Sequence, residues 1–359
     1  MRYFTPGPSQ LYPTVAAHFE TGLTRGVGSI SHRSPAFMDT VAHTKAQLTQ
    51  LLNIPDDYAI WFLSSANEAW ERIAQNSIRE SSFHLINGNF SLKFFNFVTQ
   101  YGKQPIRHQV RFGAGFSLDN IVVPDRAELI AAIANETSSG VETPPEHIYR
   151  LAERNSEKLL VVDCVSAYPT YALDLSRVDG AYFSVQKGFG MPAGLGVLLA
   201  GPRLLDRAQA LEAEKIVTGS YHRFTNLDKY GQKDQTPETP NALSIYVLGR
   251  LAEDMNARGG IEEIRAVHAA KKERLWEYFR AIPGLEYAIP VGDRSSTVTV
   301  LNAASGSQVW INALRKKGFL VGAGYGGYKE KQLRIANFPA TSREDVEDLL
   351  TAFREVAGR

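Results

Sequence analysis

Short apolar runs alternate with helical patterns along the first two hundred residues, and this alternation limits the possible folds more than any other feature. The apolar runs are YAIWFL (58–63), SFHLI (82–86), ELIAAIA (128–134), KLLVVD (158–163), GAYFSV (180–185) and LGVLLAG (195–201). Helical patterns lie between them, as at 89–101 and 144–155. Strands that alternate with helices indicate a mostly parallel sheet with helices on both faces. The sequence therefore predicts an α/β fold.

The pattern changes beyond a polar stretch that runs from Thr218 to Pro240. Two long helical patterns follow, at roughly 241–257 and 260–280, and then short apolar segments and a last helix. That helix begins near Thr341-Ser-Arg-Glu344, a capping-box pattern. We expect a large domain at 15–240 and a smaller α+β domain at 241–359, joined by the N-terminal segment 1–14.

Composition excludes several classes of partner. Lysine and arginine number 39 against 38 aspartate and glutamate, so no net field attracts nucleic acid or a membrane surface. The single cysteine, Cys164, cannot form an internal disulfide or supply a cysteine metal cluster, and we expect no metal site. The start MRYFTPGPSQLYP lacks the apolar core of a signal peptide, and no long apolar run predicts a membrane span. We expect a cytoplasmic protein.

Two glycine motifs match the dinucleotide-binding fingerprint in spacing alone. They are Gly322–Gly327 (GAGYGG) and Gly188–Ala193 (GFGMPA). A dinucleotide site requires a helix directly after the glycines, because the helix N-terminus holds the pyrophosphate. A strand-like segment follows each motif instead, QLRIAN in one case and LGVLLAG in the other. A nicotinamide-dependent dehydrogenase is therefore disfavoured.

Two charged residues follow neighbouring apolar runs. Asp163 ends KLLVVD, and Lys187 comes just after GAYFSV within the glycine-rich stretch SVQKGFGMPAGLG. Most lysines before a glycine are solvated turn residues, and a terminal aspartate often caps a loop. At the carboxyl edge of a sheet, however, a desolvated lysine can attack an aldehyde and a carboxylate can hold a protonated ring nitrogen.

Further residues suggest a phosphate pocket and a stacking ring. The segment Leu63–Glu68 passes from a strand into a helix, where small residues and backbone N–H groups suit a phosphate, although Ser65 could be only a helix cap. Phe90 could stack on a ring or belong to the core. Lysine, carboxylate, phosphate pocket and ring are together what pyridoxal 5′-phosphate (PLP) requires.

Taken in order, these segments resemble the class V aminotransferases, which have the aspartate-aminotransferase-like fold, fold type I of the PLP-dependent transferases. The similarity runs from TPGPSQL (5–11) to LRIAN (333–337). The residues that carry it are Ile30–Arg33, Asn135–Thr137, Val162–Asp163, Ser184–Gly188, Gly194–Gly196, Thr239–Pro240 and Leu333–Arg334. Within the class, the chain is most similar to the phosphoserine aminotransferases.

The resemblance implies a role for each matching residue. Lys187 would form the Schiff base with PLP, and Asp163 would bind the pyridine nitrogen. The expected cofactor contacts are Ser65, Ala66, Asn67, Phe90, Thr137, Asp163, Val165, Gln186, Lys187, Glu238 and Thr239. Arg334 would bind the substrate α-carboxylate, and His32 with Arg33 would bind a distal phosphate. Since Thr239 would reach the cofactor of a second subunit, the resemblance also implies a homodimer with shared active sites.

The resemblance leaves the substrate open among small amino acids and keto acids. Transfer from glutamate to 3-phosphohydroxypyruvate, a step of serine biosynthesis, is the first expectation. Phe90 stands where that group usually has tryptophan, Asn67 where it has arginine, and Glu238 where it has asparagine; no histidine occurs in GYGGYKEKQ (324–332). The last three departures weaken phosphate recognition and favour, as the alternative, an alanine or serine aminotransferase acting on glyoxylate or pyruvate. A catalytically inactive PLP-fold binding module is the third possibility, which the intact Lys187 and Asp163 argue against.

Overall fold

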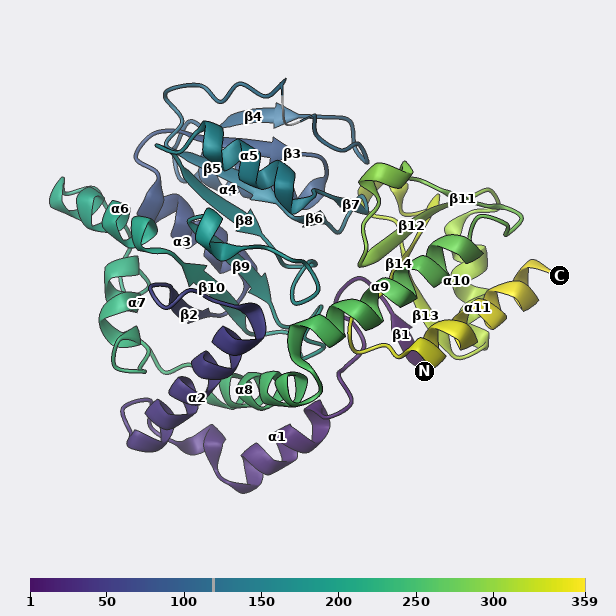
Figure 1. Ribbon diagram of the computed structural model, residues 1–359, viewed down its shortest axis with the longest axis horizontal. Helices are drawn as coiled ribbons and strands as arrows, with labels where there is room; N and C mark the ends of the chain where they lie inside the picture. The colour runs from purple at the N-terminus through teal and green to yellow at the C-terminus, as the bar shows by residue number, and fades with distance from the viewer. Residues whose placement is uncertain (118–119, 359) are drawn as a thin grey trace.

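A seven-stranded sheet is the largest feature of the computed structural model, which describes residues 1–117 and 120–358 (Figure 1). In spatial order its strands are β2 (Ala59–Leu63), β10 (Gly196–Ala200), β9 (Gly180–Ser184), β8 (Leu159–Asp163), β5 (Leu129–Ile133), β3 (Ser82–Ile86) and β4 (Ile106–Gln109). The six apolar runs correspond to β2, β3, β5, β8, β9 and β10, so the predicted α/β fold is confirmed.

The strands from β9 to β4 run parallel, while β10 is antiparallel to both of its neighbours. The carboxyl ends of β8 and β9 therefore meet at one edge of the sheet. Along β8, Leu160 and Val162 contact one group of core residues, and Leu159 and Val161 contact the other. Burial on both faces explains why this strand reads as an unbroken apolar run.

Helices cover both faces of the large sheet (Figure 1). One face is covered by α3 (Ala66–Ser77), α4 (Asn89–Gln100), α6 (Pro202–Ala213) and α7 (Phe224–Gly231). The other is covered by α1 (Val15–Thr24), α2 (Pro35–Leu52), α5 (Pro145–Arg154) and α8 (Ala242–Ala257). The sequence patterns did not predict α6 and α7.

A second sheet of five strands has a core of its own. Its strands, in order, are β1 (Arg2–Phe4), β13 (Phe319–Ala323), β14 (Gln332–Ala336), β12 (Val298–Ala303) and β11 (Leu285–Tyr287). The helices that pack on it are α9 (Gly260–Tyr278), α10 (Ser307–Lys316) and α11 (Arg343–Ala357). The first strand of the chain thus joins the C-terminal sheet, and both termini lie in this part of the molecule (Figure 1). The division at residue 240 stays a prediction; α8, which follows it, packs against α1 and α2.

A serine caps the start of both α2 and α11. Ser34 caps α2 by accepting from Phe37 N at 3.3 Å, and Pro35 is the first helical residue. The capping box of α11, however, lies one residue later than predicted, between Ser342 and Asp345. Thr341 is not the cap: its carbonyl oxygen, which would start the helix hydrogen bonds at that position, accepts from Lys271 Nζ at 2.7 Å instead.

None of the helices in the part of the chain that the structure describes is both long enough and apolar enough to cross a membrane.

Candidate active site

A buried amine and a buried carboxylate lie together at the carboxyl edge of the large sheet. Asp163 is the last residue of β8, and Lys187 follows the end of β9 by three residues. Their exposed fractions are only 5% and 7%. The parallel pairing of β8 with β9 brings these two residues to the same edge, as the sequence predicted.

Thr137 holds the amine of Lys187. Lys187 Nζ donates to Thr137 Oγ1 at 2.8 Å and lies 5.1 Å from the centroid of the Phe90 ring. Burial lowers the pKa of Lys187, against the opposing effect of the carboxylates of Asp163 and Glu136. A lowered pKa increases the fraction of neutral amine, which is the form that attacks an aldehyde.

The N-terminal segment packs against Lys187 at the edge of the large sheet. Ser9 Oγ donates to Lys187 O at 2.7 Å, and Ser9 N donates to Gln186 O at 2.9 Å. Gly7 has a φ of +140°, and a Cβ there would lie 2.9 Å from Lys187 Cε. Only glycine allows the chain to pass this close to the lysine stem. The sequence gave no indication of this contact, because 178 residues separate Ser9 from Lys187.

The surroundings of Asp163 favour a positively charged partner for its carboxylate. Burial raises the pKa of its carboxyl, although the Val165 N–H, the charge of Lys187 and a hydrogen bond from Tyr182 oppose that effect. Val165 N donates to Asp163 Oδ1 at 2.9 Å, and Trp70 Nε1 donates to Tyr182 Oη at 2.8 Å. A buried carboxylate gains most from a cationic partner, and a protonated ring nitrogen is such a partner.

The first turn of α3 lines a cavity with small side chains. Ser65 caps α3 by accepting from Glu68 N, and Ala66 N donates to Ser184 Oγ at 2.8 Å, which ties the turn to the end of β9. Gln186 Oε1 is buried there without a hydrogen-bond partner among the described residues. The Gln186 side chain also carries an NH2 group that can donate to a phosphate, and together with the helix N-terminus, Lys187 and Asp163 it forms a set of groups that fits PLP.

Glu136 fixes the position of Phe90 at the start of α4. The Glu136 side chain is fully buried and accepts from Ser91 N at 2.9 Å and from Phe90 N at 3.1 Å. It also accepts from Ser138 N at 3.1 Å. Gly88 has no room for a side chain, since a Cβ would lie 2.3 Å from Glu136 Cγ. Sequence reasoning missed this role, because the partners of Glu136 come from a segment 45 residues away.

Arg334 links the small sheet to the site. From β14, its Nη1 donates to Thr137 O at 3.1 Å and its Nε donates to Ala323 O at 2.8 Å. The guanidinium carbon lies 5.4 Å from the centroid of the Tyr325 ring, which contacts Phe90. Burial lowers the pKa of Arg334 to about 10, so the group stays charged and can bind a carboxylate.

Most of the predicted cofactor contacts line one cavity of about 330 Å³. They are Ser65, Ala66, Asn67, Phe90, Thr137, Asp163, Val165, Gln186 and Lys187. Arg334 is bonded to the Thr137 backbone at the cavity wall. The remaining four predicted residues, His32, Arg33, Glu238 and Thr239, are not among the residues that line this cavity.

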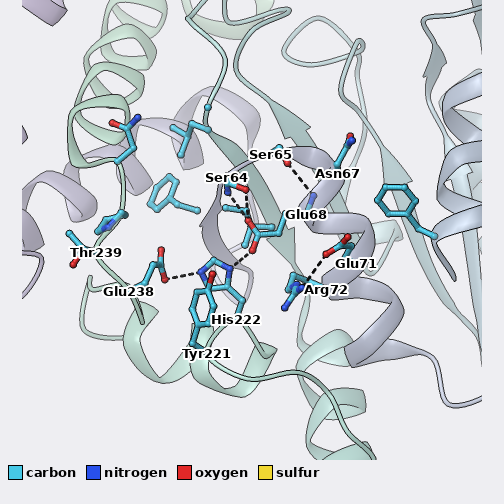
Figure 2. A pocket seen from close by; sticks show the side chains of 17 residues that line it. Ser64, Ser65, Asn67, Glu68, Glu71, Arg72, Tyr221, His222, Glu238 and Thr239 are labelled. Atoms are coloured by element: carbon cyan, nitrogen blue, oxygen red, sulfur yellow. Dashed lines mark hydrogen bonds and ion pairs between the residues drawn. The ribbon is translucent and has the colours of Figure 1, made fainter. Parts of the chain in front are cut away.

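Those four residues lie together elsewhere on the same chain. Arg33 donates to Thr236 O at 2.8 Å, and His32 Nδ1 lies 3.3 Å from Thr239 Oγ1. Glu238 and Thr239 line a second pocket, of about 650 Å³, which shares Ser65 and Asn67 with the first (Figure 2). The two pockets therefore meet at the first turn of α3.

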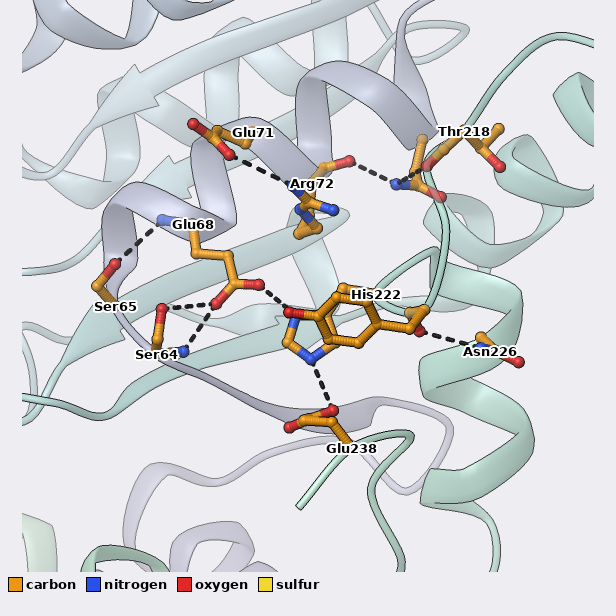
Figure 3. A network of polar contacts seen from close by, with 11 residues as sticks. Ser64, Ser65, Glu68, Glu71, Arg72, Thr218, His222, Asn226 and Glu238 are labelled. Atoms are coloured by element: carbon orange, nitrogen blue, oxygen red, sulfur yellow. Dashed lines mark hydrogen bonds and ion pairs between the residues drawn. The ribbon is translucent and has the colours of Figure 1, made fainter. Parts of the chain in front are cut away.

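His222 joins this second pocket by a network that the sequence did not reveal (Figure 3). Its Nδ1 contacts Glu68 Oε1, and its Nε2 lies 2.7 Å from Glu238 Oε2. His222 thus pairs with the Glu238 carboxylate, which the sequence analysis counted among the departures that weaken phosphate recognition. His222 lies in the polar stretch that showed no pattern, so only its folded position identifies it.

Comparisons with known proteins agree with this geometry. The family model for Aminotransferase class-V matches residues 116–349 of this chain. The phosphoserine aminotransferase of Rhodococcus opacus (strain B4) is 29% identical, over 96% of this chain and 92% of that protein. A crystal structure of a phosphoserine aminotransferase from Cytophaga hutchinsonii has a TM-score of 0.97 and 40% identity, covering 99% of this chain and 98% of that one. The alanine–glyoxylate aminotransferase of Nostoc sp. has a TM-score of 0.84 at 24% identity, covering 99% and 94%, and shows the common fold.

Proposed function

Because the chain belongs to the class V aminotransferases, we propose that it transfers the amino group of glutamate to 3-phosphohydroxypyruvate, giving phosphoserine and 2-oxoglutarate. The chain is a PLP-dependent transaminase, whose substrates are amino acids and keto acids. The observation that carries the choice of acceptor is the 40% identity, over nearly the whole chain, with a phosphoserine aminotransferase.

The buried pair supports the proposed chemistry. When bound, PLP supplies an aldehyde for a lysine amine and a ring that accepts electrons. Lys187 Nζ would take the proton from the substrate Cα and deliver it to the cofactor, since its lowered pKa leaves a neutral amine available near neutral pH. Asp163 would keep the ring nitrogen protonated, and Phe90 would contact the ring.

Arg334 is our candidate for the substrate α-carboxylate. Its guanidinium is fixed through the Ala323 and Thr137 carbonyls, so the group is oriented before substrate arrives. The contact with Thr137 also couples substrate binding to the lysine, because the Thr137 hydroxyl accepts from Lys187 Nζ.

We assign His32, Arg33 and Thr239 to the active site of a partner subunit in a homodimer. This assignment agrees with their location together on one chain but away from the Lys187 cavity. His32 and Arg33 would then bind the distal phosphate of the substrate, and Thr239 would bind the cofactor phosphate. A cytoplasmic location stays a prediction from the sequence.

The aminotransferases that act on glyoxylate or pyruvate remain the alternative, with a missing phosphate donor at Asn67 in their favour. The alternative is weaker, because the comparison with an alanine–glyoxylate enzyme, at 24% identity, supports the fold alone. A non-catalytic binding module is disfavoured, because both Lys187 and Asp163 are buried side by side with the partners that catalysis needs.

An acceptor comparison with Arg33→Ala tests the proposal. If Arg33 binds the distal phosphate, the KM for 3-phosphohydroxypyruvate rises at least about tenfold, the scale of one charge-assisted hydrogen bond, while the KM for glyoxylate changes little. Arg25→Ala, on the surface at the end of α1, is the matched control and keeps both values. Equal effects on both acceptors, or turnover of glyoxylate alone, would reject the phosphorylated substrate.

A further inference from the structure

An imidazole bridges two carboxylates beside the proposed phosphate pocket (Figure 3). His222 has an exposed fraction of 4%, and each of its ring nitrogens faces a carboxylate oxygen, that of Glu68 on one side and that of Glu238 on the other. A neutral imidazole carries one N–H donor, whereas the imidazolium carries two. Two carboxylate acceptors therefore select the cationic form of His222.

The electrostatics agree with this geometry. Burial alone lowers the pKa of His222, but the hydrogen bonds with Glu238 and Glu68 outweigh it and raise the pKa to about 9. For Glu68, burial alone raises the pKa, and the bonds from His222 and Ser64 outweigh it and lower the pKa to about 2. The ion triad is thus formed at neutral pH.

The triad connects two segments that meet at the cofactor site. Glu68 Oε2 accepts from Ser64 N and from Ser64 Oγ, both at 2.8 Å, which fixes the turn that leads into α3. On the other side, Glu238 precedes Thr239, and Thr236 Oγ1 donates to Glu238 O at 2.7 Å. His222 therefore holds the 236–239 segment against the α3 turn, as Figure 2 also shows.

The charged side chains around His222 affect whether a phosphate can bind in the adjacent Lys187 cavity. The charged side chains that line the pocket are Glu68, Glu71, Arg72, His222 and Glu238. Arg72 pairs with Glu71 at 3.3 Å, so His222 is the cation that faces Glu238. Without it, an unpaired carboxylate would stand next to the Ser65 and Asn67 rim of the Lys187 cavity and would repel a dianion.

We propose that His222 is a positioning residue for phosphate binding: as an imidazolium it neutralises Glu238, so that the phosphate of the cofactor can bind at the α3 turn of the same chain. By holding the 236–239 segment it also fixes Thr239, which we assign to the site of the partner subunit. This inference rests on the proposed function, since it takes PLP as the cofactor. It also explains how the chain can carry Glu238 in a region that must accept an anion.

The test measures cofactor binding by apoprotein rather than turnover. We would titrate wild type, His222→Gln, Glu238→Gln and the double variant with PLP and with pyridoxal, which lacks the phosphate. The inference predicts that His222→Gln weakens PLP binding at least about tenfold with little change for pyridoxal. In the Glu238→Gln background, His222→Gln should cause little further loss of PLP affinity, because no carboxylate then remains to be neutralised.

Glu71→Gln, which removes a carboxylate from the same pocket but not from the triad, is the control and keeps PLP affinity. An unchanged PLP affinity in His222→Gln would overturn the inference. Equal losses for PLP and pyridoxal without rescue by Glu238→Gln would also overturn it, since His222 would then serve the fold alone. If wild type itself bound no PLP, the proposed function would fail, which is a separate outcome.

If His222→Gln does not fold, the pH dependence of wild type and Glu238→Gln replaces it. The titratable and charged groups that face His222 are Glu68, Glu71, Arg72, Tyr221 and Glu238. PLP affinity of wild type should fall more steeply than that of Glu238→Gln as the pH rises through about 9, where His222 loses its proton. Parallel curves would overturn the inference.

Discussion

At the residue scale, the proposed chemistry depends on burial, which shifts the pKa values of the neighbours Lys187 and Asp163 in opposite directions. Burial disfavours the charged form of each group, so it lowers the pKa of Lys187 and raises that of Asp163. Their mutual attraction limits both shifts. A cationic ring nitrogen would satisfy Asp163 and leave Lys187 free to react as a neutral amine.

Replacing Lys187 by alanine tests this division of roles. Among the described residues that line the cavity, Lys187 alone carries an amine. We expect transamination to fall about a thousandfold or more, since both nucleophile and base are lost, and PLP to be removed by dialysis. Activity and visible absorbance after dialysis are the measurements.

Lys93→Ala provides the matched control for that variant. Lys93 Nζ lies 5.3 Å from the same Phe90 ring but is exposed and bonded to Tyr325 Oη at 3.0 Å. This variant should keep its cofactor through dialysis. Retention of PLP and activity by Lys187→Ala would contradict the assignment of the lysine.

Sequence patterns could locate the residues that we propose to act on the cofactor, but not the residues that position them. Lys187 and Asp163 were predictable because each follows a recognisable apolar strand. Glu136, Tyr182 and His222 were not, because their partners lie on segments distant in sequence. In the sequence, Glu136 cannot be distinguished from a surface glutamate, because only folding brings the backbone N–H donors to its carboxylate.

At the element scale, Glu136 stabilises the start of α4 and the loop before it. Its carboxylate accepts from the backbone N–H groups of Phe90, Ser91 and Ser138. Glu136→Gln places an amide against these donors, so we expect a loss of about 1–3 kcal/mol in the free energy of unfolding, the cost of unsatisfied buried groups. Urea denaturation measures it.

Glu146→Gln is the control for the effect on stability of losing a glutamate charge at a helix start. Glu146 lies in the first turn of α5 and is exposed. Its effect should stay within about 0.5 kcal/mol. Similar small losses in both variants would show that the buried contacts of Glu136 contribute little.

The ion triad that joins α3 to the 236–239 segment makes stability depend on pH. The folded pKa of His222, about 9, lies above its ordinary value of 6.5. Its contribution is therefore complete below about pH 6.5 and is lost as the pH rises through about 9. The free energy of unfolding of wild type should exceed that of His222→Gln at about pH 6, and this difference should shrink by about pH 10. A constant difference would contradict the bridging role.

Most elements were predictable because local patterns specify them. The strands of the large sheet other than β4, together with α4, α5, α8 and α9, follow apolar periodicity. β1 was not predictable, because Arg2–Phe4 forms a strand only by pairing with β13, more than three hundred residues later. The capping box of α11 was misplaced by one residue because the bond from Lys271 Nζ to Thr341 O, a tertiary contact, cannot be read from the local pattern.

At the scale of the whole molecule, the proposed roles of His32, Arg33 and Thr239 call for a homodimer. These residues lie together but do not line the Lys187 cavity, so we propose that each chain supplies them to the site of its partner. C2 symmetry would then give two equivalent sites.

Hybrid dimers test the shared site. A dimer of one Lys187→Ala chain and one Thr239→Ala chain retains one site in which both residues are intact, provided that Thr239 serves the partner. We expect about half the activity of the wild-type dimer, with wild-type PLP affinity at that site, because one of two symmetric sites is unchanged. If Thr239 served its own chain, no intact site would exist, and the hybrid would bind PLP as weakly as Thr239→Ala.

The most direct test of the central claim follows the visible absorbance of the PLP-loaded protein through single turnovers. Glutamate should bleach the absorbance by converting the cofactor to its amine form. Candidate keto acids are then mixed with the bleached protein. The account predicts that 3-phosphohydroxypyruvate restores the absorbance much faster than glyoxylate or pyruvate. Faster restoration by the unphosphorylated acids would contradict it.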